Sequence, residues 1–426
     1  MHAERELERC VEKQLTQDGG QIEGCPCYHN VCMDMFCKWA ISAKRCQTQI
    51  PEACNRKMRN ALDYAVYSLR PTGQGVPWGD SDPDDQAVQT AVLGYRVFGS
   101  REWTNAVGRI ISAEKMRKIC AKYCFSTIGV NLKELFTDCG QSGELLPRCS
   151  WQHQLHQVMM RTSWTADALS VFFACRVPCQ NGHGHIDPAS FDFCAYGKAL
   201  LVDPGRYTYR EEEMRRTIKS AEMHNALTIG GREPFEYIDT FSYAGERDGC
   251  MLNLEEGEHF MAAQAMHTSY FPAIHERLIG IIDHSFLIVW DRIYHLLTGE
   301  AVKIRYNMNT QTAFIREDGV VSTLDAENFC IRSTRNLIPS LETGIISERL
   351  DEMIPSTRLC LTDDSKDRNT RNYLSVIIPF TKECLEISEI VLSESGESSE
   401  FTVDDRHYIC VWRNSRFEVF AHAGGH

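Results

Sequence analysis

The 426-residue sequence predicts a multidomain α+β protein in which helical hairpins precede an antiparallel β-domain. Two observations support this class. Apolar residues recur at helical spacing over much of residues 1–140, whereas short β-rich runs separated by turn residues dominate residues 141–426. A chain of this length exceeds one ordinary hydrophobic core, so we expect two domains with a boundary between residues 140 and 141.

The helical half is divided by its turn signals. Asp18-Gly19-Gly20 ends the first helical pattern, and a Pro/Gly/Asp-rich loop covers residues 71–85. Alternating helices with short loops are typical of stacked αα-hairpins. The expected helices cover about 2–16, 31–46, 51–70, 84–98, 101–107 and 113–124.

The second half reads as an antiparallel sandwich. Its strand-like runs include DALSVFFACRV, HFMAAQAM, AVKIRYNM, YLSVIIPF, HYICVW and RFEVFAH. In RLIGIIDHSFLIVWDRI, Asp283-His284 lies between two apolar runs and is expected to form a hairpin turn.

Composition limits the classes of partner. A net charge of −13 without a basic tail disfavours nucleic acid, and no apolar run approaches the ~20 residues needed to cross a membrane. The first ten residues are charged and contain no apolar core of a signal peptide. The 19 cysteines are spread along the chain and are expected to be reduced, packed thiols, which favours a cytoplasmic location. These features do not indicate an oligomeric state.

The stretch from Asn181 to His224 is the most informative. It places His183, His185 and Asp187 at alternate positions, so the three side chains would point the same way if this run were extended. A hairpin follows (SFDFCA, turn YGK, ALLVD) and ends at Asp203, which would lie opposite Phe191; the chain near Pro188 must therefore fold His185 back. Imidazoles and a carboxylate gathered in this way are plausible Zn²⁺ ligands; the alternative is histidines that cap strands.

The same residues resemble a known family. HGHIDPASFDFCAYGKALLVDPGRYTY followed by HNALTIGG is similar to the signature of the heparinase II/III-type polysaccharide lyases, a superfamily that includes oligoalginate lyases. The resemblance implies an α/α toroid followed by a C-terminal β-sandwich with a zinc site. It implies His185, Asp203 and His224 as the metal ligands and His183 as a histidine that faces the substrate.

Two further stretches resemble this family. DGGQIEGCPCYHN is similar to the toroid segment that carries a catalytic tyrosine, which falls on Tyr28, and PWGDSD resembles a family loop. The chain departs from the family in one respect. The family toroid normally has more helices ahead of this tyrosine, and one of them carries an Asn or His that neutralises the substrate carboxylate. We therefore expect an incomplete toroid, either because the sequence is truncated or because this member lacks the group.

The function implied is cleavage of uronic-acid glycans by β-elimination. Tyr28 is predicted to be the general acid/base, with nearby positive charge lowering its pKa, and His183 to neutralise the carboxylate or act as the base. Zinc is expected to be structural. Glu23 is expected to orient or cap rather than donate a proton. The predicted substrate-binding residues are Glu23, His29, Arg161, Tyr207 and Tyr209, and the predicted partner is an acidic polysaccharide or oligosaccharide.

Two alternatives remain open from the sequence. A glycoside hydrolase on a similar toroid would need two facing carboxylates, for which Asp80 and Asp82 are the conspicuous pair in the helical half. A non-catalytic carbohydrate-binding remnant is the other alternative. The cations Arg161, Arg206, Arg210, Arg215, Arg216 and Lys219 are clustered in sequence and could serve an anionic sugar.

Overall fold

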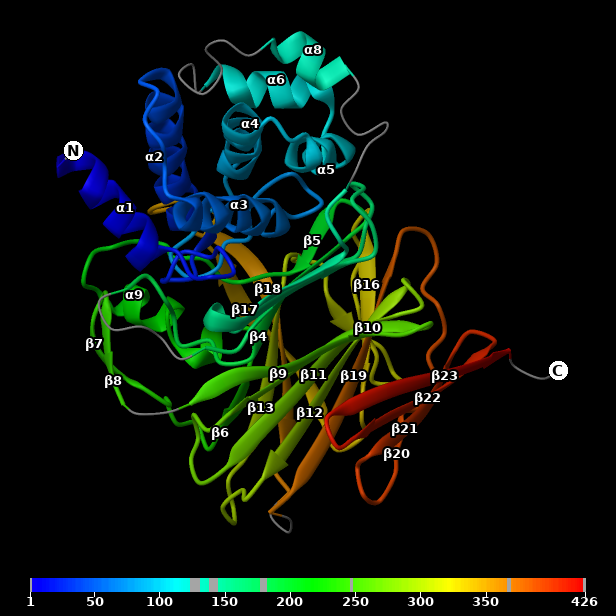
Figure 1. The fold of residues 1–426 in the computed structure, drawn as a ribbon. Coiled ribbons are helices and arrows are strands. Elements are labelled where there is room, and N and C mark those ends of the chain that lie inside the picture. The colour runs from blue at the N-terminus through cyan, green and yellow to red at the C-terminus, as the bar shows by residue number, and fades with distance from the viewer. Residues whose placement is uncertain are drawn as a thin grey trace.

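The computed structural model describes residues 2–122, 131–137, 145–176, 182–245, 248–365 and 369–423. The predicted domain boundary at 140/141 and the end of the helix predicted over 113–124 lie outside these residues. The helices of residues 2–137 gather at one end of the molecule, and antiparallel sheets with one short later helix form the rest (Figure 1). The predicted α+β class, with helices first and strands second, is confirmed.

The helices lie close to their predicted positions. α2 begins five residues earlier than expected, at Pro26, because proline fits the first turn, where no intrahelical N–H bond is needed. Among the described residues, no helix is long and apolar enough to cross a membrane. The helices of this layer are α1 (His2–Gln14), α2 (Pro26–Arg45), α3 (Glu52–Tyr67), α4 (Gln86–Phe98), α5 (Glu102–Ile110), α6 (Ala113–Ala121) and α8 (Leu132–Thr137).

The first sheet has nine antiparallel strands and lies next to the helices (Figure 1). Its strand order is β1-β2-β3-β4-β5-β13-β18-β17, and β6 also pairs with β13. The strands are β1 (Cys149–Gln152), β2 (Gln157–Arg161), β3 (Ser170–Ala174), β4 (Ser190–Ala195), β5 (Lys198–Leu201), β6 (Leu227–Ile229), β13 (Val302–Met308), β17 (Ile338–Ile346) and β18 (Ile354–Asp363).

The second sheet has eight strands in the order β14-β15-β16-β19-β12-β11-β10-β9. The turn between β11 and β12 is Asp283-His284, as predicted, with φ of 48° and 55°. The strands are β9 (Gly249–Glu256), β10 (Phe260–His267), β11 (Ile274–Ile282), β12 (Phe286–Tyr294), β14 (Phe314–Ile315), β15 (Val321–Ser322), β16 (Asn328–Ser333) and β19 (Arg371–Phe380).

Two smaller sheets complete the described fold. A four-stranded sheet lies beside the second sheet, and the two-stranded ribbon β7–β8 lies near the short helix α9 (Figure 1). Their elements are β7 (Glu236–Asp239), β8 (Ser242–Ala244), α9 (Glu213–Ile218), β20 (Val391–Leu392), β21 (Ser398–Val403), β22 (Arg406–Arg413) and β23 (Arg416–Ala423); single 3₁₀ turns cover His153–Leu155 (η1) and Ala221–Met223 (η2).

Side-chain alternation along the strands explains the layering. On β3, Phe172 belongs to the core shared with the helices, whereas Phe173 belongs to the core between the two large sheets. On β12, Val289 faces that same core and Trp290 packs against the four-stranded sheet. The order is therefore helices, first sheet, second sheet and four-stranded sheet, and each interface has its own apolar core.

Buried cations connect the helical layer to the first sheet. Arg70 follows α3 and forms a bidentate pair with Asp192 of β4, with both side chains almost fully buried. Arg161 of β2 donates at 2.9 Å to the carbonyl of Tyr67, the last residue of α3, and to that of Leu69 just beyond it, and it stacks on Trp164. The prediction of Arg161 as a substrate-binding residue is therefore wrong, because the side chain is 1% exposed and caps a helix.

The predicted hairpin is β4–β5, with Gly197 at φ 77° in its turn. Phe193 pairs with Leu201, a register that continues to Asp203 opposite Phe191 as expected, but β5 itself ends at Leu201 and not at Asp203. A turn from Asp187 to Ser190, closed by a 3.1 Å backbone hydrogen bond, folds the preceding segment back as predicted. Residues 182–189 are not a strand, however, so the premise that His183, His185 and Asp187 point the same way does not hold.

Candidate active site and metal centre

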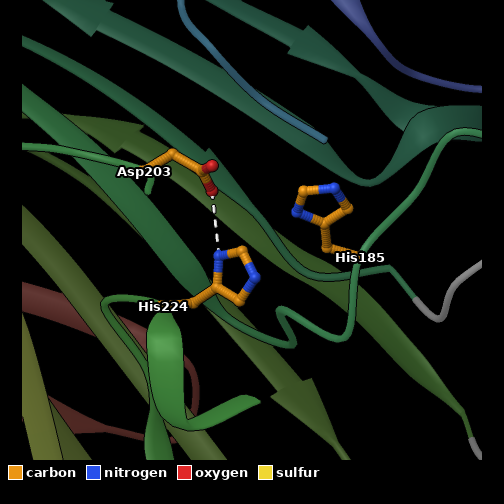
Figure 2. Close-up of side chains that lie close together, drawn as sticks. All are labelled: His185, Asp203 and His224. Carbon is orange, nitrogen blue, oxygen red and sulfur yellow. Dashed lines mark hydrogen bonds and ion pairs between the residues drawn. The ribbon is translucent and has the colours of Figure 1, made fainter. Parts of the chain in front are cut away.

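His185, Asp203 and His224 come together as a buried group (Figure 2). His185 lies in the segment before β4, Asp203 follows β5, and His224 follows η2. One ligand atom from each lies within 4.8 Å of the others, and all three side chains are buried. Two imidazoles and a carboxylate at this spacing are a ligand set of the kind that binds Zn²⁺.

The hydrogen bonds of this group leave two ring nitrogens without partners. Nδ1 of His224 lies 3.0 Å from Oδ2 of Asp203, and Nε2 of His185 lies 2.9 Å from Oδ1 of Asp80. Nδ1 of His185 and Nε2 of His224 are buried without a partner. A buried nitrogen lone pair without a donor is costly, and a metal ion would satisfy it. The three residues therefore fit a metal.

Protonation favours His185 as a ligand. Burial lowers the pKa of His185 to about 4, so its ring is neutral near pH 7. Burial also acts to lower the pKa of His224, but the charge and hydrogen bond of Asp203 outweigh burial and raise it. Metal binding at His224 would therefore compete with a proton, which makes the affinity pH-dependent.

Asp80 joins this group to the helical layer. It lies in the loop between α3 and α4 and is fully buried. Besides accepting from His185, its carboxylate accepts from Arg215 of α9 at 2.6 and 2.7 Å. Burial acts to raise its pKa, but these two partners outweigh burial and hold the pKa well below its usual range. The Asp80–His185 bond orients the imidazole in the way that carboxylates orient zinc-bound histidines.

Asp187 lies close to the metal group and is also buried. Its Oδ2 has no hydrogen-bond partner, and burial raises the pKa of this carboxyl to about 7. The carboxyl is therefore poised between its charged and neutral forms near neutral pH.

A second cluster surrounds Tyr28, which lies in the first turn of α2. Its ring stacks on that of His183, with ring centroids 3.7 Å apart and planes at 16°. Its hydroxyl forms a short hydrogen bond with the hydroxyl of Tyr209. Glu23 accepts hydrogen bonds from Nδ1 and from the backbone N–H of His183. The structure thus brings together Tyr28, His183, Glu23 and Tyr209, as predicted.

Arg206 and Phe241 complete this cluster. Arg206 donates to the Tyr209 hydroxyl at 2.9 Å and to both carboxylate oxygens of Asp82 at 2.9 and 2.6 Å. Phe241, between β7 and β8, stacks on Tyr209 and meets the edge of His183. The Asp82–Arg206 pair could not be predicted from sequence, because the partners are separated by 124 positions.

The backbone of His183 is held by the loop that carries Asp80. The carbonyl of His183 accepts from the N–H of Asp80 at 2.9 Å and from the thiol of Cys25 at 3.3 Å. Gly79 has φ of 59°, and an added Cβ would lie 2.7 Å from both Cys25 Sγ and His183 O. Only glycine allows this approach, which fixes His183 beside Tyr28.

The expected lowering of the pKa of Tyr28 is wrong for the free protein. Burial raises the pKa of Tyr28, and the hydrogen bond from Tyr209 and the charge of Arg206 offset this only in part. Asp82 and Asp80 already pair with the nearest cations, Arg206 and Arg215. Tyr28 is therefore a neutral phenol near pH 7.

Several other predicted roles need correction. His29 is fully buried, with Nε2 donating to the carbonyl of Ala61 and Nδ1 accepting from the N–H of Gln21, so it does not face a substrate. The hydroxyl that reaches Tyr28 belongs to Tyr209, whereas the role of the half-buried Tyr207, whose carbonyl accepts from the N–H of Asp351, stays a prediction. Asp80 and Asp82 are bound in ion pairs and are not a free pair of facing carboxylates.

These features define a multidomain α+β protein with a polar site between a helical layer and an antiparallel sheet. Two family models match the chain: "Heparinase II/III N-terminus" over residues 2–102 and "Heparinase II/III-like, C-terminal" over residues 154–380. The second alone covers more than half of the chain. The chain therefore belongs to the heparinase II/III-like family, as the sequence resemblance indicated.

Individual relatives agree with this assignment. A heparin-sulfate lyase of Pedobacter heparinus is 21% identical over 381 residues, which cover 87% of this chain and 52% of the relative. The crystal structure of a mutant heparan sulfate lyase from Pedobacter heparinus has a TM-score of 0.76 at 18% identity, covering 99% of this chain and 62% of that one. A heparinase III gene product has a TM-score of 0.75 at 18% identity, covering 98% and 61%. The chain thus spans about half the length of the curated relative.

Proposed function

We propose that this protein is a polysaccharide lyase that cleaves an acidic glycosaminoglycan of the heparin-sulfate type by β-elimination. The stacked Tyr28–His183 pair, with its Glu23 and Tyr209 partners, is the observation that carries the proposal. The family supports the reaction class, and the name of the Pedobacter relative supports the substrate class. We propose further that the helices are part of an α/α toroid and that the two large sheets are the family β-sandwich.

The reaction needs a base at C5 of the uronate and an acid at the leaving O4. Removal of the C5 proton forms the C4=C5 double bond as the C4–O4 bond breaks, and O4 then takes up a proton. Tyr28 is the proton-transfer residue, and as a neutral phenol it can supply the proton to O4. His183 presents Nε2, because Nδ1 is bonded to Glu23. Nε2 takes the C5 proton when this lies on its face; as an imidazolium, His183 instead neutralises the substrate carboxylate.

Glu23 supports both roles of His183. The hydrogen bond from His183 is the main cause that lowers the pKa of Glu23, so the carboxylate is charged near neutral pH. A carboxylate on Nδ1 fixes the tautomer and stabilises a proton gained at Nε2. Because the chain spans about half of its curated relative, these residues are proposed as the contribution of this chain to the activity.

We propose that His185, Asp203 and His224 bind one Zn²⁺ with a structural role. The two buried nitrogens without partners and the Asp80 contact of His185 support this. A bound Zn²⁺ would supply a positive charge and fixed coordination that hold the three segments together. His183 is two residues from His185, so a fixed His185 restricts where His183 can lie.

Tyr28→Phe tests the function. On heparan sulfate or its oligosaccharides, the wild-type chain is expected to form an unsaturated product that absorbs in the near ultraviolet. Tyr28→Phe removes only the hydroxyl and keeps the ring that stacks on His183, so turnover should fall by ~10² or more while the protein stays folded. Normal turnover in Tyr28→Phe would show that another residue transfers the proton.

A control is Tyr64→Phe, since Tyr64 is a fully buried tyrosine of the helical layer whose hydroxyl donates to Gln157 of β2 at 3.0 Å. It loses a structural hydrogen bond, worth about 0.5–1.5 kcal/mol of stability, and should keep its turnover. A wild-type chain that binds the glycan but forms no unsaturated product would refute the proposed reaction.

A further inference from the structure

The hydroxyls of Tyr28 and Tyr209 belong to a longer row of polar groups that the proposed reaction does not yet use. The row runs from Asp82 through Arg206 and Tyr209 to Tyr28. It joins the helical layer, which contributes its two ends, to the loop after β5, which contributes its middle. Arg206 and Tyr209 are only partly buried, so their arrangement depends on these contacts.

Arg206 gives this row a direction. A guanidinium has N–H donors and no acceptor, so Arg206 donates to the Tyr209 oxygen and to Asp82. A phenol carries one hydrogen. The Tyr209 oxygen accepts from Arg206, so its own hydrogen is directed at the Tyr28 oxygen, and burial raises the pKa of Tyr209 so that it keeps this hydrogen. The single hydrogen of Tyr28 is then left over for another acceptor.

We propose that Arg206 and Tyr209 are positioning residues that make Tyr28 the proton donor to the leaving group. The inference rests on the proposed function and deepens it. Tyr28 gives its proton to O4 as the C4–O4 bond breaks, and the phenolate that remains accepts the Tyr209 hydrogen bond. The C5 proton goes to Nε2 of His183, and water returns a proton to Tyr28 afterwards. Asp82 holds Arg206 in place through both carboxylate oxygens.

Two substitutions separate the positioning of Tyr28 from simple packing. Tyr209→Phe keeps the ring that stacks on Phe241 and loses only the hydroxyl. Arg206→Gln removes the charge that polarises Tyr209. Arg413→Gln is the matched control, because Arg413 is an exposed residue of β22 that pairs with Glu397 in the four-stranded sheet.

Two substrates distinguish the loss of proton donation by Tyr28 from a structural effect of the substitution. A glycan leaving group needs a proton on O4, whereas a 4-deoxy-4-fluoro uronide releases fluoride and needs none. Tyr209→Phe and Arg206→Gln should lower kcat on a heparan-type oligosaccharide about 10-fold or more, with KM within about twofold, and should keep kcat on the fluoride substrate within about twofold. Equal losses on both substrates, or no loss on either, would overturn the proposal. Arg413→Gln should match wild type on both substrates.

If the wild type eliminates neither substrate, this result would refute only the proposed function. A titration of Tyr28 then still tests whether Tyr209 and Arg206 act on its hydroxyl. 3,5-Difluorotyrosine placed at position 28 reports its own ionisation by ¹⁹F NMR. Loss of the Tyr209 hydroxyl should move the midpoint to higher pH by about one pH unit, the size expected for a hydrogen bond to a charged group. An unchanged midpoint in both Tyr209→Phe and Arg206→Gln would overturn the inference. Besides Tyr209 and Arg206, the charged and titratable groups that act on Tyr28 are Cys27, Asp80 and His183, and His183 is itself bonded to Glu23.

Discussion

Asp80→Ala should destabilise the protein more than any ordinary surface substitution. Asp80 is fully buried and is the carboxylate partner of Arg215, which is buried as well. Removing one partner of a buried pair leaves the other charge without compensation and costs about 3–5 kcal/mol. The same change removes the acceptor of His185 Nε2, at 2.9 Å, which adds about 1–3 kcal/mol. Arg215 keeps bonds to Thr240 and to the carbonyl of Arg206, so the total should fall near the lower part of this range.

Urea unfolding with and without a chelator measures the effect. The midpoint of the transition should fall by about 1 M or more in Asp80→Ala, because a slope of a few kcal/mol per molar applies to domains of ordinary size. Asp85→Ala is the control, since Asp85 forms a surface pair with Lys122 and should cost less than about 1 kcal/mol. Asp80→Leu combined with Arg215→Met should recover part of the loss, because an apolar pair leaves no buried charge.

The pH dependence gives an independent check on the same carboxylate. Its pKa is lower in the folded protein than in the unfolded chain, so its contribution to stability is complete above about pH 4 and is lost as the pH falls further. Asp80→Ala should flatten this part of the stability curve. A midpoint within experimental error of wild type, together with an unchanged acid branch, would refute the reasoning from burial and pairing.

Three further predictions follow from the metal group, from His29 and from the shared core. Protein prepared without added metal should contain about one Zn²⁺ per chain by elemental analysis. His185→Ala should lose this metal and should lose more thermal stability than His183→Ala. A zinc content far below one per chain that is the same in His185→Ala would refute the proposed metal site. Burial lowers the pKa of His29 from 6.5 to about 4, so this ring binds a proton more readily in the unfolded chain than in the folded protein. The free energy of unfolding should therefore fall by on the order of 3 kcal/mol as the pH is lowered from 6.5 to about 4. His29→Gln should lose that dependence in unfolding measured against pH, and an identical pH profile would contradict it. A fragment of residues 1–140 should be poorly soluble or molten by near-ultraviolet circular dichroism and dye binding, because its core includes Phe172 of β3; a sharply folded monomer would be evidence against this.

The grouping of His185, Asp203 and His224 was predictable because the residues lie in one short stretch with clear strand and turn signals, and because the resemblance to the family selected these three. Asp203 ends a hairpin whose register follows from its apolar pattern, and the turn at Pro188 was needed to bring His185 to it. Asp80 was not assigned to this group, because its partners lie 105 and 135 positions away and a GDSD loop looks like any other polar loop. Contacts of that separation depend on how the two halves pack.

The errors have a local cause. Tyr28 and His29 are neighbours in sequence, but successive residues of a helix point about 100° apart, so one reaches the site and the other faces the core. Arg161 is near the site in sequence only, because β2 directs it toward the end of α3. Proximity in sequence was a poor guide to proximity in space at these positions.

The core shared by the helices and the first sheet has a consequence for the order of synthesis. The helices leave the ribosome first, yet Met159 and Phe172, which cover part of their inner face, are encoded after α6 and α8. At roughly 5–20 residues per second, the ~50 residues between α6 and β3 delay that cover by several seconds. During this interval the apolar face of the nascent helices is open to other proteins. A chaperone that binds short exposed apolar segments would act on this chain at that stage, before any sheet has formed.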